Sequence, residues 1–171
     1  MLLPPLSWGQ WQSPGLPSTI AQPVDQPDRF ETEVWLLDMS SRLTNYIQHQ
    51  EQRTHLLKAI HKEATQAGLP PELVLAVIQT ESSFNRFAVS TAGAQGLMQI
   101  MPFWKEIIGH SRDNLLQIET NLRYGCTILS HYLEKEQGNL SRALARYNGS
   151  LGKTWYPKRV LNNWARHWSH H

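Results

Sequence analysis

The chain has 171 residues, of which 40% are hydrophobic, and it carries seven tryptophans and a formal net charge of +2. This length corresponds to one domain, and the composition is sufficient to build a hydrophobic core. The charge is mild, and no basic stripe alternates with aromatic residues, which excludes a nucleic-acid-binding surface. No run of 18 apolar residues predicts a membrane-spanning helix.

The first part of the chain differs in composition from the rest. Residues 1–28 contain six prolines separated by Gly, Ser and Gln, which predicts a flexible leader or linker. The leader has no basic start, and prolines interrupt its apolar residues, so it is not a secretion signal as written. An amphipathic helix is predicted between Phe30 and Gln50, which makes residues 29–52 an accessory element ahead of a main domain over residues 53–171.

The main domain begins with two predicted helices. The first runs from about Arg53 to Ala67, with Gly68 as its C-cap. The second starts near residue 71, because proline is tolerated in a first helical turn. Its apolar residues recur at helical spacing and are Leu73, Val74, Val77 and Ile78.

Glu81 falls on the same apolar stripe, three residues after Ile78 and four after Val77. Burial and the negative end of the helix dipole should both raise the pKa of this carboxyl. A carboxyl that stays protonated near neutral pH can act as a general acid. The alternative is a Glu81 that swings out of a frayed last turn into solvent.

The remaining elements are mostly short helices. After a glycine-rich segment they are predicted just after Pro102, around Leu115–Ile118, from Asn121 to Gly138, over Leu140–Tyr147 and over Arg159–His167. Alternating β-branched runs are absent from the sequence. The predicted fold is therefore mostly α, with at most a small hairpin or extended segment around residues 88–100.

Cysteine and histidine usage gives no sign of a metal or redox site. Cys126 is the only cysteine, which excludes an internal disulfide, and it falls in a helical apolar pattern that predicts burial. Five of the eight histidines are scattered without ligand spacing, and the other three, His167, His170 and His171, lie at the C-terminus. We expect a solvated tail there and neither a metal nor a cofactor.

Several separated blocks resemble the soluble-type lytic transglycosylases, which are lysozyme-like enzymes that cleave peptidoglycan. The blocks are Glu81-Ser82-Ser83-Phe84-Asn85, Ala88-Val89-Ser90, Gly93 to Pro102, Asn121 to Gly125, Ala143 to Gly149 and Tyr156 to Leu161. The resemblance covers about residues 54–165 and implies a lysozyme-like helical domain. One departure follows Tyr147-Asn148, where the family has Ala-Gly and this chain has Gly149-Ser150.

The resemblance also implies a mechanism with a single acid. Most glycosidases use two carboxylates, yet no Asp or Glu lies between Glu81 and Glu106. In the family's scheme Glu81 protonates the oxygen of the β-1,4 bond between N-acetylmuramic acid and N-acetylglucosamine, while the substrate's 2-acetamido group stabilises the anomeric carbon. Ionised Glu81 then takes the proton of the muramyl C6 hydroxyl, whose attack forms a 1,6-anhydro sugar. The enzyme would be a lyase.

Further site residues are carried over by position. The resemblance assigns substrate-binding roles to Ser90, Met98, Gln99, Tyr147, Asn148 and Tyr156. Four of them have a structural alternative: Ser90 as a loop cap, Met98 as core, and the two tyrosines as core aromatics with satisfied hydroxyls. The amide of Gln99 lies in an apolar run and needs hydrogen-bond partners, for which sugar hydroxyls would serve.

The implied partners are peptidoglycan glycan strands, whose stem peptides carry carboxylates that suit a weakly basic surface. We expect a monomer in the periplasm or cell envelope, with its export signal removed, and further contacts with envelope proteins. Two alternatives stay open. One is a goose-type lysozyme that delivers water and recruits a second acid, for which Asp113 is the nearest candidate. The other is a non-catalytic peptidoglycan-binding component of an envelope machine.

Overall fold

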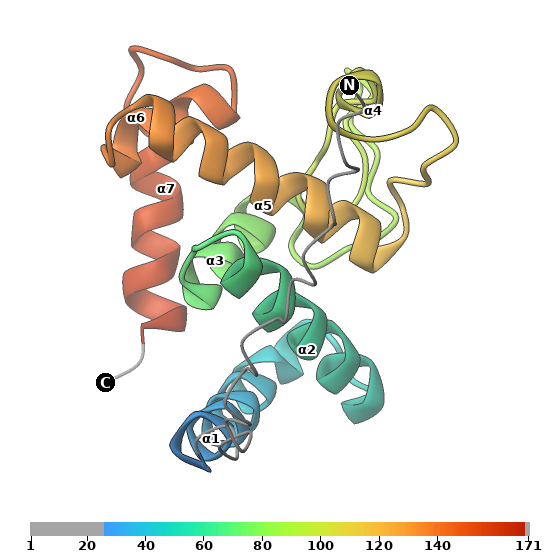
Figure 1. The fold of residues 1–171 in the computed structure, drawn as a ribbon. Coiled ribbons are helices and arrows are strands. Elements are labelled where there is room, and N and C mark those ends of the chain that lie inside the picture. Colours follow the sequence, from blue (N-terminus) through green and yellow to red (C-terminus); the bar gives the residue numbers. More distant parts are fainter. Residues whose placement is uncertain (1–25, 170–171) are drawn as a thin grey trace, which may run out of the picture.

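The computed structural model describes residues 26–169, so most of the proline-rich leader and the last two histidines lie outside the described residues. Within this range the chain is helical, which confirms the mostly α fold (Figure 1). The helices are α1 (Gln26–Arg42), α2 (Gln50–Gln66), α3 (Pro71–Ser82), α4 (Trp104–Ile108), α5 (Ile118–Lys135), α6 (Leu140–Tyr147) and α7 (Trp155–Asn163). A 3₁₀ turn, η1 (Leu43–Asn45), follows α1, and a π-helix, η2 (Trp164–Trp168), follows α7.

Helix α3 occupies the middle of the molecule, with α2, α7 and η2 packed against it (Figure 1). Its six consecutive residues from Leu73 to Ile78 are all at most 1% exposed, as expected for a helix that is apolar on every side. Pro71 occupies its first turn, and the carboxylate of Glu72 accepts a hydrogen bond from the indole N–H of Trp35 at 2.8 Å. The helix ends where Ser83 takes a left-handed conformation with φ of 49°.

Helices α5, α6 and α7 form a second group. Helix α5 contacts α2 and α6, and α6 in turn contacts α7. In Figure 1, α6 and α7 lie on one side of the molecule, whereas α4 and the loop over residues 83–103 lie on the other. The last turn of the chain is fixed by Trp168, which is 1% exposed and whose indole N–H donates to Gln79 at 2.7 Å.

The loop over residues 83–103 contains turns and two isolated antiparallel bridges, Val89 with Gln95 and Gln95 with Ile100, and none of the described residues forms a longer strand. This agrees with the prediction of at most a small extended segment. Among the described residues, no helix is long and apolar enough to cross a membrane.

One predicted helix boundary near the N-terminus is affected by an arginine. The helix predicted between Phe30 and Gln50 ends at Arg42, where η1 begins, and the residues just before α2 are not helical and are held by Arg53. The guanidinium of Arg53 donates to the carbonyl oxygens of Ile47 at 2.8 Å and Gln48 at 2.7 Å. These carbonyls therefore have partners without a helix.

The helix predicted around Leu115–Ile118 is wrong. The side chain of Asn114 accepts the N–H of Leu116 at 2.9 Å, which closes a tight turn, and the helix starts only at Ile118. The last predicted helix also starts earlier than Arg159, at Trp155, since Pro157 falls in the first turn, where proline is tolerated.

Candidate active site

Glu81 lies in the last turn of α3 and is half-buried. Its Oε1 accepts a hydrogen bond from the hydroxyl of Tyr156 at 2.5 Å, so the carboxyl is held in place and does not fray into solvent. Burial raises the pKa of Glu81 from 4.5 to about 7, while the hydrogen bond from Tyr156 and the charge of Arg159 both oppose that rise. At neutral pH this carboxyl is populated in both its protonated and its ionised form.

Two tyrosines from the C-terminal helices surround this carboxyl. Tyr156 comes from α7 and is 2% exposed, and burial and the proximity of Glu81 raise its pKa well above the ordinary value. Tyr147 ends α6, and burial and then Glu81 raise its pKa in the same way. The hydroxyl of Tyr147 donates to the carbonyl oxygen of Met98 at 2.8 Å. The structure thus brings Glu81, Tyr147, Tyr156 and the backbone of Met98 together.

The glycine-rich loop is braced by its own polar side chains. The hydroxyl of Ser90 accepts the N–H of Ala94 at 3.0 Å, which closes a turn and leaves the serine half-buried. The amide nitrogen of Gln99 donates to the carbonyls of Ala88 at 3.1 Å and Gly96 at 2.9 Å. The amide nitrogen of Gln99 thus has two partners within the loop, and its contact with sugar hydroxyls stays a prediction.

Backbone strain is located in this loop. Gln99 has φ of 52°, in the left-handed region that side chains other than glycine seldom adopt, and its two hydrogen bonds hold it there. The hydroxyl of Ser82 donates to the carbonyl of Leu97 at 2.8 Å, which ties the loop to the helical turn that carries Glu81. The loop is therefore fixed relative to the acid.

The two other residues assigned from the sequence lie at opposite extremes of exposure. The side chain of Met98 is 0% exposed and packs against Gly125 of α5, so it supports the loop from inside. Asn148 is exposed and follows the last turn of α6.

The chain has Gly149-Ser150 where the family has Ala-Gly, and the end of α6 explains this difference. Gly149 has φ of 73°, its N–H donates to the carbonyl of Arg146, and the N–H of Ser150 donates to that of Ala145. This is the Schellman arrangement, in which a glycine in the left-handed conformation ends a helix. Gly149 thus terminates α6 directly after the Tyr-Asn pair.

Asn121 is a site-supporting residue that sequence reasoning did not single out. Its side chain is 1% exposed and makes three hydrogen bonds. Its amide oxygen accepts the N–H of Met98 at 2.8 Å, and its amide nitrogen donates to the carbonyls of Gln95 at 2.8 Å and Leu115 at 2.7 Å. The available signal was an amide among apolar residues at the start of the α5 pattern, because a buried amide requires partners.

Alanine substitutions at two loop glycines are expected to destabilise the protein to different extents. Gly96 has φ of 78°, and a Cβ on it would collide with the Asn121 amide and the Leu115 carbonyl; Gly93 has φ of 90° but faces open space. We expect Gly96→Ala to lower the free energy of unfolding by about 3 kcal/mol or more and Gly93→Ala by about 1 kcal/mol. Urea unfolding of both variants measures the difference, and equal losses would contradict this account of the loop.

The carboxylate of Asp113 is engaged in hydrogen bonds, and the thiol of Cys126 is unreactive. Asp113 accepts the hydroxyl of Tyr124 at 2.5 Å and the N–H of His110 at 3.1 Å, and these hydrogen bonds lower its pKa. Burial raises the pKa of the Cys126 thiol to about 12, which keeps it protonated and unreactive. No group of three His, Cys, Asp or Glu residues in the part of the chain that the structure describes could hold a metal ion.

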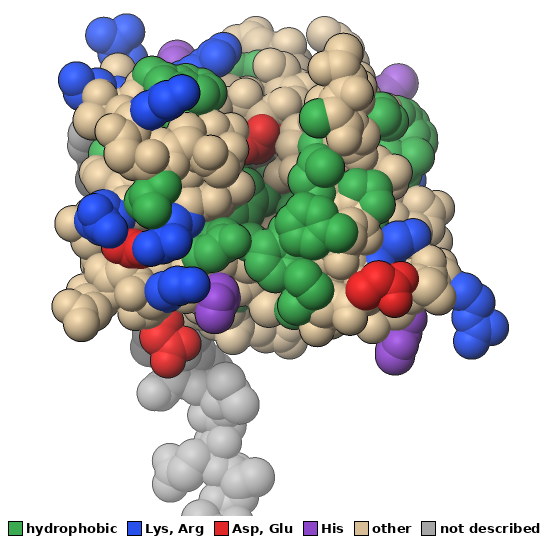
Figure 2. Space-filling model, turned by 90° about the horizontal axis from the view of Figure 1, so that it is seen from above, with side chains coloured by type: hydrophobic (Ala, Val, Ile, Leu, Met, Phe, Trp, Pro, Cys, Tyr) green, Lys and Arg blue, Asp and Glu red, His purple; other side chains and the backbone are tan. Residues whose placement is uncertain are grey.

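The molecule is hollowed on one face. Figure 2 shows a depression with hydrophobic side chains along it and an acidic group inside it, between two raised sides. Two large aromatic residues, Phe103 before α4 and Trp155 at the start of α7, are each 53% exposed. Trp155 meets the ring of Tyr156 edge to face, with 5.8 Å between centroids. Exposed aromatic rings are suited to stacking on sugars.

Comparison with known proteins identifies one family. A family model described as the transglycosylase SLT domain matches residues 58–164, which is more than half of the chain. The chain is 34% identical over 121 residues to proteins named membrane-bound lytic murein transglycosylase C from Yersinia pestis and Yersinia pseudotuberculosis. The match covers 61% of this chain and 34% of those proteins, so the chain spans about a third of the length of these relatives.

A similar solved structure is that of a 70-kDa soluble lytic transglycosylase in complex with bulgecin A. The likeness has a TM-score of 0.50 and 25% sequence identity, and it covers 81% of this chain and 24% of the other. It agrees with the fold predicted from the sequence.

Proposed function

Since the chain belongs to the transglycosylase SLT domain family, as its motifs predicted, we propose that it is a lytic transglycosylase that cleaves peptidoglycan glycan strands. The observation that carries the proposal is Glu81, a single half-buried carboxyl with a pKa raised to about 7 and a hydrogen bond from Tyr156. A carboxyl whose pKa lies near neutral pH can both donate and accept a proton there, which a one-acid mechanism requires.

In the first step, protonated Glu81 gives its proton to the glycosidic oxygen, and the bond from that oxygen to the muramyl anomeric carbon breaks. The 2-acetamido group of the muramyl residue stabilises the positive charge at the anomeric carbon. In the second step, ionised Glu81 removes the proton of the C6 hydroxyl, and the C6 oxygen bonds to the anomeric carbon. Glu81 regains its proton, no water is consumed, and the product ends in a 1,6-anhydro sugar.

The surrounding residues have supporting roles in this proposal. Tyr156 orients the carboxyl, and Tyr147 and Met98 hold the loop against α6. Ser90, Gln99 and Asn148 contact the glycan, Ser90 and Gln99 in addition to their bonds within the loop. Asp113, the candidate second acid, accepts hydrogen bonds from the hydroxyl of Tyr124 and the N–H of His110, which supports the one-acid scheme over a second acid that activates water.

The substrate places the protein in the periplasm or cell envelope. The relatives from Yersinia are named membrane-bound murein transglycosylases, which supports an envelope location.

The mass of the products tests the proposed reaction. We expect purified sacculi treated with the protein to release muropeptides that are one water lighter than the products of a lysozyme. Mass spectrometry of the soluble fraction makes the comparison, with hen-type lysozyme digestion as the reference. Reducing-end products would instead indicate a hydrolase, and the absence of soluble products together with retained binding to sacculi would indicate a binding protein.

A further inference from the structure

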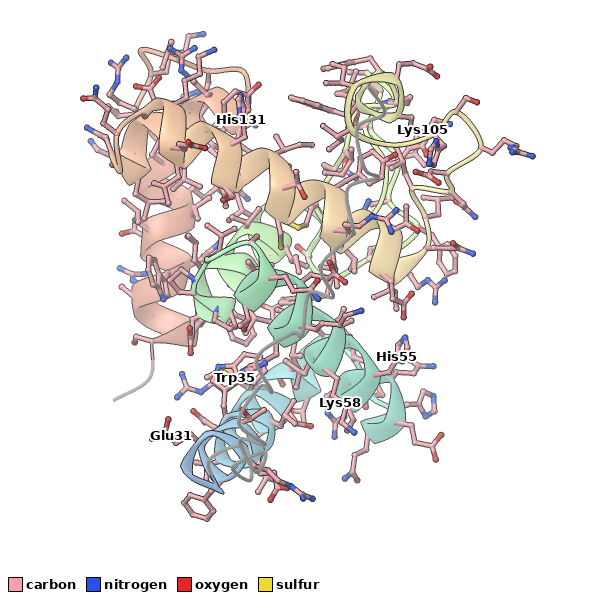
Figure 3. The ribbon with its side chains drawn as sticks, in the orientation of Figure 1. Glu31, Trp35, His55, Lys58, Lys105 and His131 are labelled. Carbon is pink, nitrogen blue, oxygen red and sulfur yellow. The ribbon has the colours of Figure 1, made fainter. Side chains whose placement is uncertain are left out.

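Four aromatic rings form a continuous cluster where α4 meets α5. Phe103, just before α4, and Trp104, its first residue, have 5.3 Å between ring centroids, and Trp104 meets Tyr132 of α5 edge to face at 6.2 Å. Tyr132 in turn lies 5.5 Å from the ring of His131. We call these four residues the α4–α5 ring cluster. Figure 3 labels His131 and also Lys105, which follows Trp104, and both lie in the half of the molecule away from α1.

The cluster lies at the surface, and its polar edges are free. Phe103 is 53% exposed, His131 is exposed, and Trp104 and Tyr132 are half-buried. Neither the indole N–H of Trp104 nor the hydroxyl of Tyr132 has a hydrogen-bond partner among the described residues, whereas the buried indole N–H of Trp168 has one inside the protein. Aromatic faces with free hydrogen-bonding edges suit a ligand that offers both an apolar face and polar groups around it.

A sugar ring is a ligand of this kind, because its C–H groups form an apolar face and its hydroxyls surround that face. A purely apolar partner is a poorer match. It would cover the indole N–H of Trp104 and the hydroxyl of Tyr132 without offering an acceptor, and a polar group that loses water without gaining a partner costs binding free energy.

Helix α5 connects the ring cluster to the surroundings of Glu81. Gly125 of α5 packs against the side chain of Met98. The carbonyl oxygen of Met98 accepts the hydroxyl of Tyr147 at 2.8 Å, and Tyr147 lies close enough to Glu81 for the ionised carboxyl to raise its pKa. Tyr132 follows Gly125 by seven residues, which is two turns along the same face of α5 and a rise of about 10 Å, close to the length of a disaccharide.

The loop over residues 83–103 makes a second connection between the two places. Phe103 and Trp104 come five and six residues after Met98, and the N–H of Trp104 donates to the carbonyl of Met101 at 3.1 Å. Figure 2 shows that the hydrophobic side chains in the depression extend away from the acidic group. A chain of sugars bound at Glu81 can therefore continue onto the ring cluster.

We propose that the α4–α5 ring cluster is a sugar-binding site, which holds the glycan strand about two sugars away from the bond cleaved at Glu81. The proposal rests on the proposed function, since it supposes that the strand lies at Glu81. A strand long enough to reach both places should bind more tightly than a short one. Because the cluster does not touch the reacting bond, it should stabilise bound substrate and transition state alike and act on KM, with kcat unchanged.

Binding of the hexamer of β-1,4-linked N-acetylglucosamine tests the cluster without any cleavage. This oligomer has the backbone linkage and the 2-acetamido groups of the glycan strand, and Glu81→Gln is used so that it stays intact. We expect Phe103→Ala with His131→Ala, added to Glu81→Gln, to lower the affinity for the hexamer about fivefold in isothermal titration calorimetry. Both substituted side chains are exposed, so the fold should be retained.

A site-resolved measurement follows the free indole N–H of Trp104. Its signal in a proton–nitrogen NMR spectrum is identified by its loss in Trp104→Phe. Addition of the hexamer to the Glu81→Gln protein should shift this signal, because a sugar oxygen becomes its acceptor. A signal that stays in place at saturating hexamer would overturn the sugar site.

A matched control removes the same two residue types elsewhere. Phe30 on α1 is 69% exposed, and His49, which precedes α2, is exposed. Glu31, the neighbour of Phe30, lies at the end of the molecule opposite the ring cluster in Figure 3. Phe30→Ala with His49→Ala should keep the affinity for the hexamer. An unchanged affinity in the cluster variant, or an equal fall in this control, would contradict the proposal.

Cleavage kinetics separate this inference from the proposed function. On long glycan strands, Phe103→Ala with His131→Ala in the otherwise wild-type protein should raise KM about fivefold and leave kcat unchanged. A fall in kcat with KM unchanged would show that the cluster does not act by binding the strand. Absence of anhydro-ended products from the wild-type protein would refute the proposed function alone, because the binding measurements need no cleavage and still decide whether the cluster holds a sugar.

Discussion

Replacement of Glu81 by glutamine is expected to lower the rate of glycan cleavage by about 10³-fold, the contribution typical of a general acid and base. Glutamine has nearly the shape of glutamate and keeps an oxygen that can accept the hydroxyl of Tyr156, but it cannot give or take a proton. The loss should therefore appear in kcat, with the affinity for sacculi almost unchanged. Release of anhydro-ended products and sedimentation with sacculi measure the two quantities.

Glu134→Gln is the matched control, because Glu134 is an exposed carboxylate on α5 whose side chain makes no hydrogen bond or ion pair with any of the described residues. It should retain full activity. A Glu81→Gln protein that cleaves at a rate within tenfold of wild type would show that another group supplies the proton, and the one-acid mechanism would be wrong.

The position of Glu81 could be predicted from the sequence because helical periodicity fixes the direction of a side chain over a short distance. Pro71 marks the start of α3, and from there the spacing places Glu81 on the buried stripe. Burial then dictates the direction of the pKa change. The value was not predictable, because it also depends on Tyr156 and Arg159, which are 75 and 78 positions further along the chain.

The loop was harder to predict for a related reason. Its conformation depends on hydrogen bonds between side chains and backbone groups that are distant in the sequence, as between Asn121 and Met98. Periodicity carries no information about such contacts. Gln99 illustrates the consequence: its amide needed partners, as expected, but the backbone oxygens of Ala88 and Gly96 provide them within the loop itself.

Helix boundaries were wrong where polar side chains compete with the helix for backbone groups. Asn114 closes a turn where a helix was predicted, and Arg53 satisfies the carbonyls that would otherwise extend α1. In both places the apolar pattern was correct, since Leu115 and Leu43 are buried, but the pattern alone does not distinguish a turn from a helix.

Glu81 should also make the stability of the protein depend on pH. In the unfolded chain the carboxyl ionises near pH 4.5, whereas in the folded protein its pKa is about 7. Between these values the folded state binds more protons than the unfolded state, so the free energy of unfolding falls as the pH rises. The contribution of Glu81 to the free energy of unfolding is fully present below about pH 4.5 and is lost as the pH rises through 7. Its total size is up to about 3 kcal/mol.

Urea unfolding of wild type and Glu81→Gln at pH 4.5, 6, 7 and 8 measures this contribution, because other titrating groups are common to both proteins and cancel in the difference. The lowered pKa values of Asp113 and Glu136 act at more acidic pH and are likewise shared. We expect the variant to become the more stable protein above pH 7, since it has no charge to bury, while Glu134→Gln follows wild type. Parallel curves for wild type and Glu81→Gln would mean that the folded protein holds Glu81 with an ordinary pKa, and the carboxyl would then lack the protonated population that the first step of cleavage consumes.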